Sequence, residues 1–573
     1  MAKKRSPQSK QMLMQAKQNL NTALKDEFDD KMTSLISKLE PLGKGKHSLW
    51  KNCKGIKTPS QCDKPLRNFN GTWARSDSEK AEVFAHHLQG VFQPNPDQNG
   101  FLPPPITSIP LNCRLTFSFR TFYKEIRSLN MKKSPGEDRV SPKMIAELPL
   151  VAMKLLLYIF NGMLRLGYFP QTWKVSKIKM IAKQGKDPYQ PTSYRPISLL
   201  SVTSKLFEKL MLKVFISPIM KSRNILPDHQ FGFRECHSTI EQVNRITNEV
   251  RRAFEEKQYC SAIFLDVAQA FDKVWHTGLI FKLKQIFPEP IFNILNSYLC
   301  NRKFKIVQNE YLSGEYKINA GVPQGSVFGP TLYLIYTADL PTDNNVLTST
   351  FADDTAILSR HRDPARASFI LNSHLNKLQR WLANWRIVVN ESKSTHITFT
   401  LCQKTCPIVF LNGTPIPQTT TVKYLGIHLD RRLTWLNHIK CKKQQLQLKF
   451  LELYWLLNYR SKLSIEHKTL IYKAILKPIW QYGAQLWCKA SASNVALIQT
   501  SQSKILRSIT NAPRFIKNEV IQKDLNLPPV HLEISKIRQK YLLKLATHPN
   551  NSAKNLLNIN FDSRLKRNDF PTY

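Results

Sequence analysis

The stretch TSTFADDTAIL, residues 348–358, places two adjacent aspartates, Asp353 and Asp354, within an apolar and β-prone run. Adjacent like charges repel each other, and neither carboxylate packs well inside a protein core. The chain returns to an extended pattern after Thr355, which is typical of a β-hairpin with the two aspartates near its turn. The sequence therefore predicts a positively charged group beside this turn.

A third aspartate stands in a matching context. Asp266 directly follows an apolar run, typical of a buried strand, in SAIFLDVAQAFDKVWH, residues 261–276. If the two strands are neighbours in one sheet, Asp266, Asp353 and Asp354 meet at one end of it, where hard oxygen ligands favour Mg²⁺ or Mn²⁺. Two such ions, about 4 Å apart, promote in-line phosphoryl transfer. The alternative for an isolated Asp-Asp pair is a solvated turn without a metal.

The charge balance of the chain indicates a polyanionic partner. Its 573 residues include 84 Lys and Arg against 41 Asp and Glu, which gives a formal net charge of +43. Such an excess accelerates encounter with nucleic acid or with an anionic membrane. A membrane-spanning helix is not predicted, because the most apolar run, residues 148–170, is interrupted by Lys154 and Arg165. We therefore predict nucleic acid as the partner, and no membrane.

The first residues and the cysteines indicate the cellular compartment. The chain opens on MAKKRSPQSK, which is polar and basic, unlike a signal peptide. Lys3, Lys4 and Arg5 are a short candidate for a nuclear-import patch. The ten cysteines show no CxxC pair and no matched Cys/His pairs, so we expect reduced cysteines and no structural zinc. An intracellular protein is expected.

Composition divides the chain into four regions. Residues 1–110 contain two amphipathic helices and then a linker rich in Pro, Asn and Gly. Residues 111–260 combine helices and short strands dense in Lys and Arg. Residues 261–440 alternate β-rich and helical runs, which predicts an α+β sheet covered by helices. Residues 441–573 are predicted to be all-helical and again basic.

Some local signals are specific enough to name single residues. Ser76 or Asp77 is the predicted N-cap of a helix over residues 76–92, and Ser238 with Glu241 forms a predicted capping box. Three tryptophans are expected in the core rather than as platforms for stacked bases: Trp173, Trp435 and Trp487.

In this order, the motifs resemble those of the reverse transcriptases of non-LTR (LINE-type) retrotransposons, and the jockey-like clade fits best. FADD, residues 351–354, resembles the [FY]-x-D-D hairpin, and LDVAQAFDKVWH, residues 265–276, resembles the first catalytic strand, D-x-x-x-A-[FY]-D. The resemblance extends from about residue 45 to about residue 545. Further matching stretches are residues 132–145, 179–188, 193–210, 229–239, 320–341, 384–399 and 422–439.

The resemblance implies a right-hand polymerase with an α+β fold. Residues 1–110 would form a helical N-terminal extension and linker, and residues 111–260 the fingers. Residues 261–440 would form the palm, with an antiparallel sheet and the primer grip. Residues 441–573 would form the helical thumb and C-terminal region.

The resemblance also implies which residues bind the metal ions. Asp266, Asp353 and Asp354 would bind two Mg²⁺ or Mn²⁺ ions together with the backbone carbonyl of Val267, and Asp354 would contribute least. Phe271, five residues after Asp266, matches the steric gate. Such a ring under the sugar leaves no room for a 2′-hydroxyl, so dNTPs are selected; the alternative is an ordinary core phenylalanine.

Further residues match positions that bind the incoming nucleotide. Arg195 would bind the triphosphate, because a guanidinium pairs bidentately with phosphate oxygens. Lys183 is a second candidate, whose alternative is a general contact with a nucleic-acid backbone. Gln324 and Gly325 would let the backbone approach the template–dNTP pair closely. Lys393 matches a lysine that protonates departing pyrophosphate.

Two turns complete the implied site. Lys393 ends the stretch NESK, residues 390–393, where the family usually has Asn-Pro-x-Lys, and loss of the proline is expected to loosen the turn. The primer grip is matched by Tyr424, Leu425 and Gly426.

The implied function is RNA-directed DNA polymerisation, in which a DNA primer is extended on an RNA template during target-primed reverse transcription. The expected partners are template RNA, primer or target DNA, dNTPs, an element-encoded RNA-binding protein and a separate endonuclease activity. Only about a hundred residues precede the polymerase motifs, so we expect extension of a supplied primer without nicking of DNA. Two alternatives stay open, namely an RNA-directed RNA polymerase, against which Phe271 argues, and a non-catalytic RNA-binding protein.

Overall fold

The computed structural model describes residues 7–37, 64–68, 70–105, 107, 109–110, 115–183 and 185–557. Lys3, Lys4 and Arg5, and the beginning of the family resemblance near residue 45, lie outside this range. The chain forms two compact units, which are described separately. The sheet unit comprises Asp63–Thr420 and Pro549–Ala553, and the helical unit comprises Met1–Cys62, Thr421–His548 and Lys554–Tyr573.

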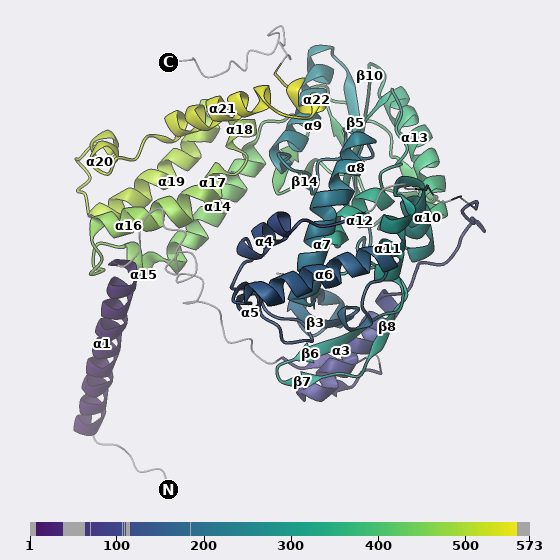
Figure 1. The fold of residues 1–573 in the computed structure, drawn as a ribbon. Coiled ribbons are helices and arrows are strands. Elements are labelled where there is room, and N and C mark those ends of the chain that lie inside the picture. Colours follow the sequence, from purple (N-terminus) through teal and green to yellow (C-terminus); the bar gives the residue numbers. More distant parts are fainter. Residues whose placement is uncertain are drawn as a thin grey trace. The chain divides into compact units, whose positions relative to one another are not determined.

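The sheet unit is built around a four-stranded antiparallel sheet in the order β11-β5-β10-β9. Figure 1 labels its two inner strands, β5 and β10. Helix α13 (Pro364–Asn384) packs on β5 and β10, and α9 (Thr239–Glu255) packs on β9 and β5. Every residue of β5 is buried, so helices and loops cover both faces of this strand. The α+β prediction is therefore confirmed. The four strands are Thr395–Phe399 (β11), Tyr259–Leu265 (β5), Asp354–His361 (β10) and Val346–Phe351 (β9).

A second sheet of the same unit has the order β4-β3-β6-β7, and β8 also pairs with β6. Helix α3 (Asp77–Val91) packs against β6, β7 and β8. The antiparallel pairing of β3 and β4 brings the segment before Lys183 next to Arg195. The strands are Val175–Ala182 (β3), Tyr194–Leu199 (β4), Arg302–Gln308 (β6), Tyr311–Leu312 (β7) and Tyr316–Ile318 (β8).

The remaining helices of the sheet unit enclose an aromatic core. Phe122, Phe160 and Phe207 are fully buried there, and the partly buried Trp173 packs against it. The helices are Phe119–Arg127 (α4), Pro142–Ala146 (α5), Leu150–Leu166 (α6), Val202–Met211 (α7), Ser217–Ser222 (α8), His276–Ile286 (α10), Glu289–Leu299 (α11) and Phe328–Tyr336 (α12). Two short hairpins add Leu66–Arg67 (β1), Trp73–Ala74 (β2), Phe410–Leu411 (β12) and Thr414–Pro415 (β13).

Among its described residues, the helical unit contains one hairpin and otherwise helices, and residues 441–557 are helical as predicted. Its tryptophans Trp435 and Trp487 are 1% and 0% exposed, so both belong to the core as expected. The elements are Pro7–Ser37 (α1), Thr421–Tyr424 (β14), Ile427–Asp430 (β15), Leu436–Glu452 (α14), Tyr454–Leu457 (α15), Ile465–Ile471 (α16), Lys477–Gln481 (α17), Ala484–Trp487 (α18), Ala492–Thr510 (α19), Asn518–Asp524 (α20) and Val530–Ala546 (α21). Asn551–Lys554 (α22) spans the boundary between the units.

Both predicted helix starts are found in the structure. Ser76 is the N-cap of α3 and forms a capping box with Glu79, and Ser238 with Glu241 caps α9 in the same way. Each box satisfies backbone N–H groups that the first helical turn leaves free. None of the helices in the described part of the chain is long and apolar enough to cross a bilayer.

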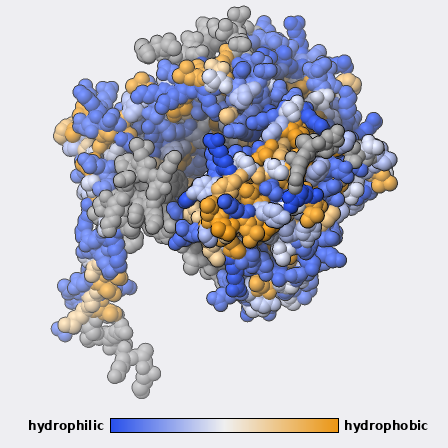
Figure 2. Space-filling view, in the orientation of Figure 1, coloured by the Kyte–Doolittle hydropathy of each residue, from blue (hydrophilic) through white to orange (hydrophobic). Residues whose placement is uncertain are grey.

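Helix α6 is apolar on two faces. Phe160, Met163 and Leu164 are buried in the aromatic core, whereas Val151 and Leu155 are 79% and 60% exposed. Figure 2 shows an apolar patch on the surface over this helix. Only one apolar face of α6 is therefore covered within the sheet unit.

The segment predicted as a linker is attached to the sheet unit. Its described residues between 93 and 110 form no helix and no regular strand, as the proline content predicts. Asn95 Nδ2 donates to the backbone oxygen of Arg386 at 2.9 Å, and Asp97 forms an ion pair with the Arg386 guanidinium at 3.0 Å. One arginine near the central sheet thus fastens this segment.

Gly232 allows the loop before α9 to approach the central hairpin. A Cβ added here would lie 2.2 Å from the backbone nitrogen of Ala352, a contact that only backbone movement relieves. We expect Gly232→Ala to lower the free energy of unfolding by about 2 kcal/mol, measured by urea titration. Gly90→Ala is the matched control, because its Cβ would meet nothing within 4 Å. That change should leave stability unaltered or raise it by about 0.5 kcal/mol, because alanine favours helix.

Candidate active site

The β9–β10 hairpin and the end of β5 bring the three predicted acidic residues together. Asp266 directly follows β5, and Thr355 of β10 pairs with Leu265 of β5. Asp354 is the first residue of β10, and Asp353 lies in the turn that precedes it. The antiparallel register therefore places Asp353 and Asp354 beside Asp266 at one end of the sheet.

A buried glutamine holds the turn of this hairpin. Ala352 has a left-handed φ of 57°, which costs a residue with a Cβ about 1–2 kcal/mol. Gln230 Oε1 accepts hydrogen bonds from Ala352 N at 2.9 Å and from Gly232 N at 2.8 Å. Gln230 is only 4% exposed, so these bonds are shielded from water and offset the strain. The family resemblance covered this residue without giving it a role.

The three carboxylates influence each other electrostatically. Burial raises the pKa of Asp353, and the charge of Asp266 raises it further, whereas Arg195 acts in the opposite direction. Burial raises the pKa of Asp354 to about 6, and the charges of Asp353 and Asp266 act in the same direction. Mutual repulsion of this kind is relieved by a bound cation. The electrostatics therefore favour divalent metal binding at this sheet end.

The side chain of Asp266 contacts a lysine in this structure. Its carboxylate is 50% exposed and lies 3.9 Å from Lys393 Nζ. Among the described residues, no three Asp, Glu, His or Cys side chains form a ready-made metal cluster. The donor set nevertheless fits Mg²⁺ or Mn²⁺, because it offers carboxylate and carbonyl oxygens on a strand end and a tight hairpin.

The backbone of Asp266 also supports the turn that carries Lys393. Asn390 N donates to Asp266 O at 2.8 Å, and Asp266 N donates to Ser394 Oγ at 3.2 Å. Within the turn, Asn390 Oδ1 accepts from Ser392 Oγ at 2.8 Å and from Lys393 N at 3.1 Å. The asparagine side chain thus closes the turn that the missing proline was expected to loosen.

A cleft of about 340 Å³ opens beside Asp353. Burial lowers the pKa of Lys183, and the charges of Arg195 and Lys393 lower it further. Positive side chains that repel each other in a cleft are stabilised by an anion, as a triphosphate would provide. Six of the predicted site residues line the cleft: Lys183, Arg195, Val267, Phe271, Gln324 and Asp353.

One wall of the cleft comes from α3, which sequence reasoning did not include in the site. His87, Leu88 and Val91 all line it. Burial and the charge of Lys183 lower the pKa of His87, so this imidazole is neutral at pH 7. The amphipathic pattern of α3 predicted a buried face but not what that face would cover.

Aromatic packing fixes Phe271 at the cleft. Its ring stacks on Tyr333 with a centroid distance of 4.6 Å and an interplanar angle of 27°. Phe233 packs against it in a T-shaped arrangement, with a centroid distance of 5.8 Å. Tyr333 is 3% exposed, so it provides a rigid support for the ring. This support is what a steric gate requires.

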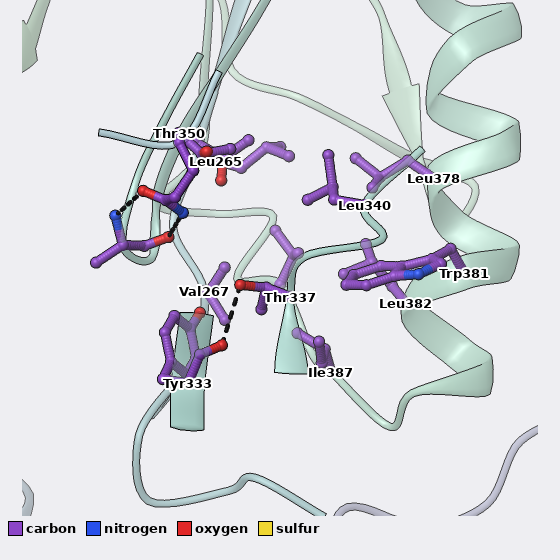
Figure 3. Close-up of a pocket in the computed structure, with 14 residues that line it drawn as sticks. Leu265, Val267, Tyr333, Thr337, Leu340, Thr350, Leu378, Trp381, Leu382 and Ile387 are labelled. Atoms are coloured by element: carbon purple, nitrogen blue, oxygen red, sulfur yellow. Dashed lines mark hydrogen bonds between the residues drawn. The ribbon is translucent and has the colours of Figure 1, made fainter. Parts of the chain in front are cut away.

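Behind the end of the central sheet lies a small apolar pocket. Figure 3 shows Leu265, Val267 and Tyr333 on one side of it, with Trp381 and Leu382 of α13 on the other. Its volume is about 20 Å³, which holds no more than one water molecule. This pocket is therefore part of the core that supports the site, not a place for substrate.

The turn with Gln324 and Gly325 docks on β4. Ser198 N donates to Gln324 O at 2.8 Å. Gly325 has a φ of 121°, and a Cβ here would lie 2.6 Å from Ser198 O. Only glycine fits both the conformation and the close approach.

The predicted primer grip is a hairpin of the helical unit. Tyr424 ends β14, and Leu425 and Gly426 form the turn with φ values of 47° and 76°. Two successive positive φ values are typical of the tight turns that favour hairpins. Tyr482 Oη donates to Leu425 O at 2.6 Å and holds the turn from within the same unit.

Comparison with known proteins agrees with this geometry. Residues 181–429 match the family model described as "Reverse transcriptase (RNA-dependent DNA polymerase)". The match includes the β9–β10 hairpin, the end of β5 and most of the cleft. Residues 181–429 therefore form a domain of the reverse transcriptase family, whose members generally depend on divalent metal ions.

Within that family, the chain is similar to polymerases of non-LTR retrotransposons. It is 40% identical over 539 residues to the "Probable RNA-directed DNA polymerase from transposon X-element" of Drosophila melanogaster. That alignment covers 91% of this chain and 58% of the relative. It is 38% identical over 543 residues to the "RNA-directed DNA polymerase from mobile element jockey" of the same species, over 91% of this chain and 59% of the relative. The chain thus spans about three fifths of the length of these relatives.

Solved structures show a weaker similarity. A telomerase from Candida tropicalis, solved with a fragment of telomeric RNA, aligns over 68% of this chain and 64% of that chain, with 14% identity and a TM-score of 0.34.

Proposed function

We propose that this chain is the RNA-directed DNA polymerase of a non-LTR retrotransposon, which extends a DNA primer on an RNA template in target-primed reverse transcription. The convergence of Asp266, Asp353 and Asp354 beside a cleft lined by Lys183 and Arg195 carries the proposal. Acidic residues that bind metal ions and basic residues that bind triphosphate are the two requirements of nucleotidyl transfer.

The residues of the site divide into three tasks. Asp266 and Asp353, with the backbone carbonyl of Val267 and a smaller contribution from Asp354, would hold two Mg²⁺ or Mn²⁺ ions. When bound there, such ions would lower the pKa of the primer 3′-hydroxyl and neutralise charge on the triphosphate. Arg195 and Lys183 bind the triphosphate, and Phe271 lies under the sugar. Lys393, whose Nζ lies 3.9 Å from the Asp266 carboxylate, would give a proton to the departing pyrophosphate.

The charge of the chain supports a nucleic-acid substrate. A net charge of +43 provides strong, salt-dependent attraction to template RNA and primer or target DNA. A nuclear location follows from that role, because target DNA is there. An element-encoded RNA-binding protein and a separate endonuclease activity complete the proposed set of partners.

Primer extension tests the proposal. The purified chain is given a DNA primer annealed to an RNA template, Mg²⁺ and either dNTPs or NTPs. We expect products with dNTPs that disappear with EDTA. Strong RNA binding without extension would instead support a non-catalytic protein, and extension with NTPs alone would support an RNA polymerase.

A further inference from the structure

We propose that Asp272 is a positioning residue, which holds the side-chain amide of Gln324 so that its carbonyl oxygen faces the incoming nucleotide. This inference rests on the proposed function. Asp272 and Gln324 both line the cleft, although 52 positions separate them in the sequence. Asp272 is the final aspartate of the stretch that resembles D-x-x-x-A-[FY]-D, and the sequence analysis assigned it no role.

The hydrogen bonds fix the orientation of the amide. Gln324 Nε2 donates to both carboxylate oxygens of Asp272, at 2.9 Å each. An ionised carboxylate only accepts hydrogen bonds, so it binds the amide nitrogen and rejects the amide oxygen. Gln324 Oε1 is therefore directed away from Asp272, as an acceptor for a donor group on the sugar or base of a nucleotide.

The backbone around Asp272 is firmly placed. Val322 N donates to Phe271 O, and Gly321 N donates to Val274 O, both at 2.8 Å. Gly321 has a φ of 93°, and a Cβ there would lie 2.6 Å from Asp272 O. The segment after β5 and the segment before Gln324 are thus in close backbone contact. This backbone contact keeps the Asp272 carboxylate beside the Gln324 amide and limits the movement of both.

The charged surroundings set when Asp272 is ionised. Burial raises its pKa to about 7, while the hydrogen bonds from Gln324 and the charges of Lys183 and Lys273 oppose this rise. His87 and Arg195 are the other basic side chains that line the cleft, and Asp353 is the other acidic one. Above pH 7 the ionised carboxylate of Asp272 accepts hydrogen bonds from Gln324 Nε2. Below pH 7 the protonated carboxyl can donate to Gln324 Oε1 instead, which reverses the orientation of the amide.

A double-mutant cycle tests this assignment. Asp272→Asn, Gln324→Met and the double variant are compared with wild type in single-nucleotide primer extension. The new asparagine can donate to Gln324 Oε1 and turn the amide, so we expect the KM for dNTP to rise about 10-fold, with a smaller change in kcat. The double variant should be no worse than Gln324→Met, because Asp272 acts through Gln324. Independent, multiplying effects, or an unchanged KM in Asp272→Asn, would overturn the inference.

Two further readouts separate positioning from a structural role. The kcat/KM of wild type divided by that of Asp272→Asn should approach one as the pH falls from 8 to 6, because Asp272 becomes protonated. Groups that titrate alike in both proteins do not change this ratio. The thermal midpoint of Asp272→Asn at pH 8 should equal or exceed that of wild type, because a buried charge is removed. A lower midpoint together with a ratio that does not change with pH would indicate a structural residue.

The controls keep the two proposals apart. If Asp272→Asn fails to fold, the pH test passes to Gln324→Met, whose kcat/KM should lack the step near pH 7 that is expected for wild type. Asp343→Asn, which removes a carboxylate paired with Lys377 outside the cleft, should leave the KM for dNTP unchanged. Wild type that does not extend a primer would defeat the proposed function. Wild type that extends normally beside an Asp272→Asn variant with unchanged KM would defeat only this inference.

Discussion

Asp353→Asn is expected to reduce RNA-templated primer extension by a factor on the order of 1,000. The substitution keeps the size of the side chain and removes one negative charge from the end of the central sheet. That charge would hold a catalytic cation. Asp354 is the only other carboxylate in the β9–β10 hairpin. The measurement is the single-turnover rate of dNTP addition at saturating primer–template.

The fold should survive this change. Burial and Asp266 raise the pKa of Asp353, so the native structure already disfavours the ionised form. We therefore expect Asp353→Asn to unfold at the same temperature as wild type or higher, and to bind the primer–template with unchanged affinity. Asp343→Asn, on the loop before β9, is the matched control and should retain full activity. Activity within tenfold of wild type in Asp353→Asn would contradict the metal-binding role.

Asp354→Asn provides an internal comparison at the neighbouring position. The family resemblance implies that Asp354 contributes less than Asp353 to metal binding. We expect a measurable loss of activity, smaller than that of Asp353→Asn in the same assay. An equal loss would mean that both carboxylates bind the ions directly.

The second large effect is expected at Phe271. Phe271→Ala should lower the preference for dNTP over NTP by a factor on the order of 100. The ring is held by Tyr333 and Phe233, so it cannot move aside for a 2′-hydroxyl, whereas the smaller alanine leaves room for one. The preference is measured as the ratio of kcat/KM for dATP and ATP opposite the same template base.

Phe271→Tyr is the matched control for this experiment. It keeps the ring, so the preference for dNTP should remain near that of wild type. If Phe271→Ala discriminates as well as wild type, the gate assignment is wrong, and the ring is an ordinary part of the core that includes Tyr333. The RNA polymerase alternative would then regain support.

Local patterns in the sequence predicted much of the fold. The hairpin around Asp353, the strand before Asp266, the N-cap at Ser76 and the capping box of Ser238 with Glu241 are found where the patterns placed them. Each of these features depends on residues within a few positions of each other. Side-chain alternation, capping hydrogen bonds and turn chemistry act over that range, so they can be recognised without a structure.

Longer-range features of the site could not be predicted in this way. The closure of the Lys393 turn by Asn390, the role of Gln230 under the hairpin and the wall formed by His87 all depend on which segments pack together. No local sequence pattern predicts that α3 covers a cleft lined by residues about 100 to 270 positions away. The fastening of the linker through Asp97 and Arg386 is of the same kind, because 289 positions separate its partners.

By itself, the sequence predicted the class of chemistry, because its motifs, taken in order, resemble those of reverse transcriptases, and three aspartates at predicted strand ends on a chain of charge +43 favour cations and a polyanion. The tertiary structure alone decided how the site is held. It buried Asp272 against Gln324, packed Tyr333 under Phe271 and set Lys393 beside Asp266. The physical reason is that the identity of a residue fixes which bonds its side chain can form, whereas folding fixes which partner comes within reach.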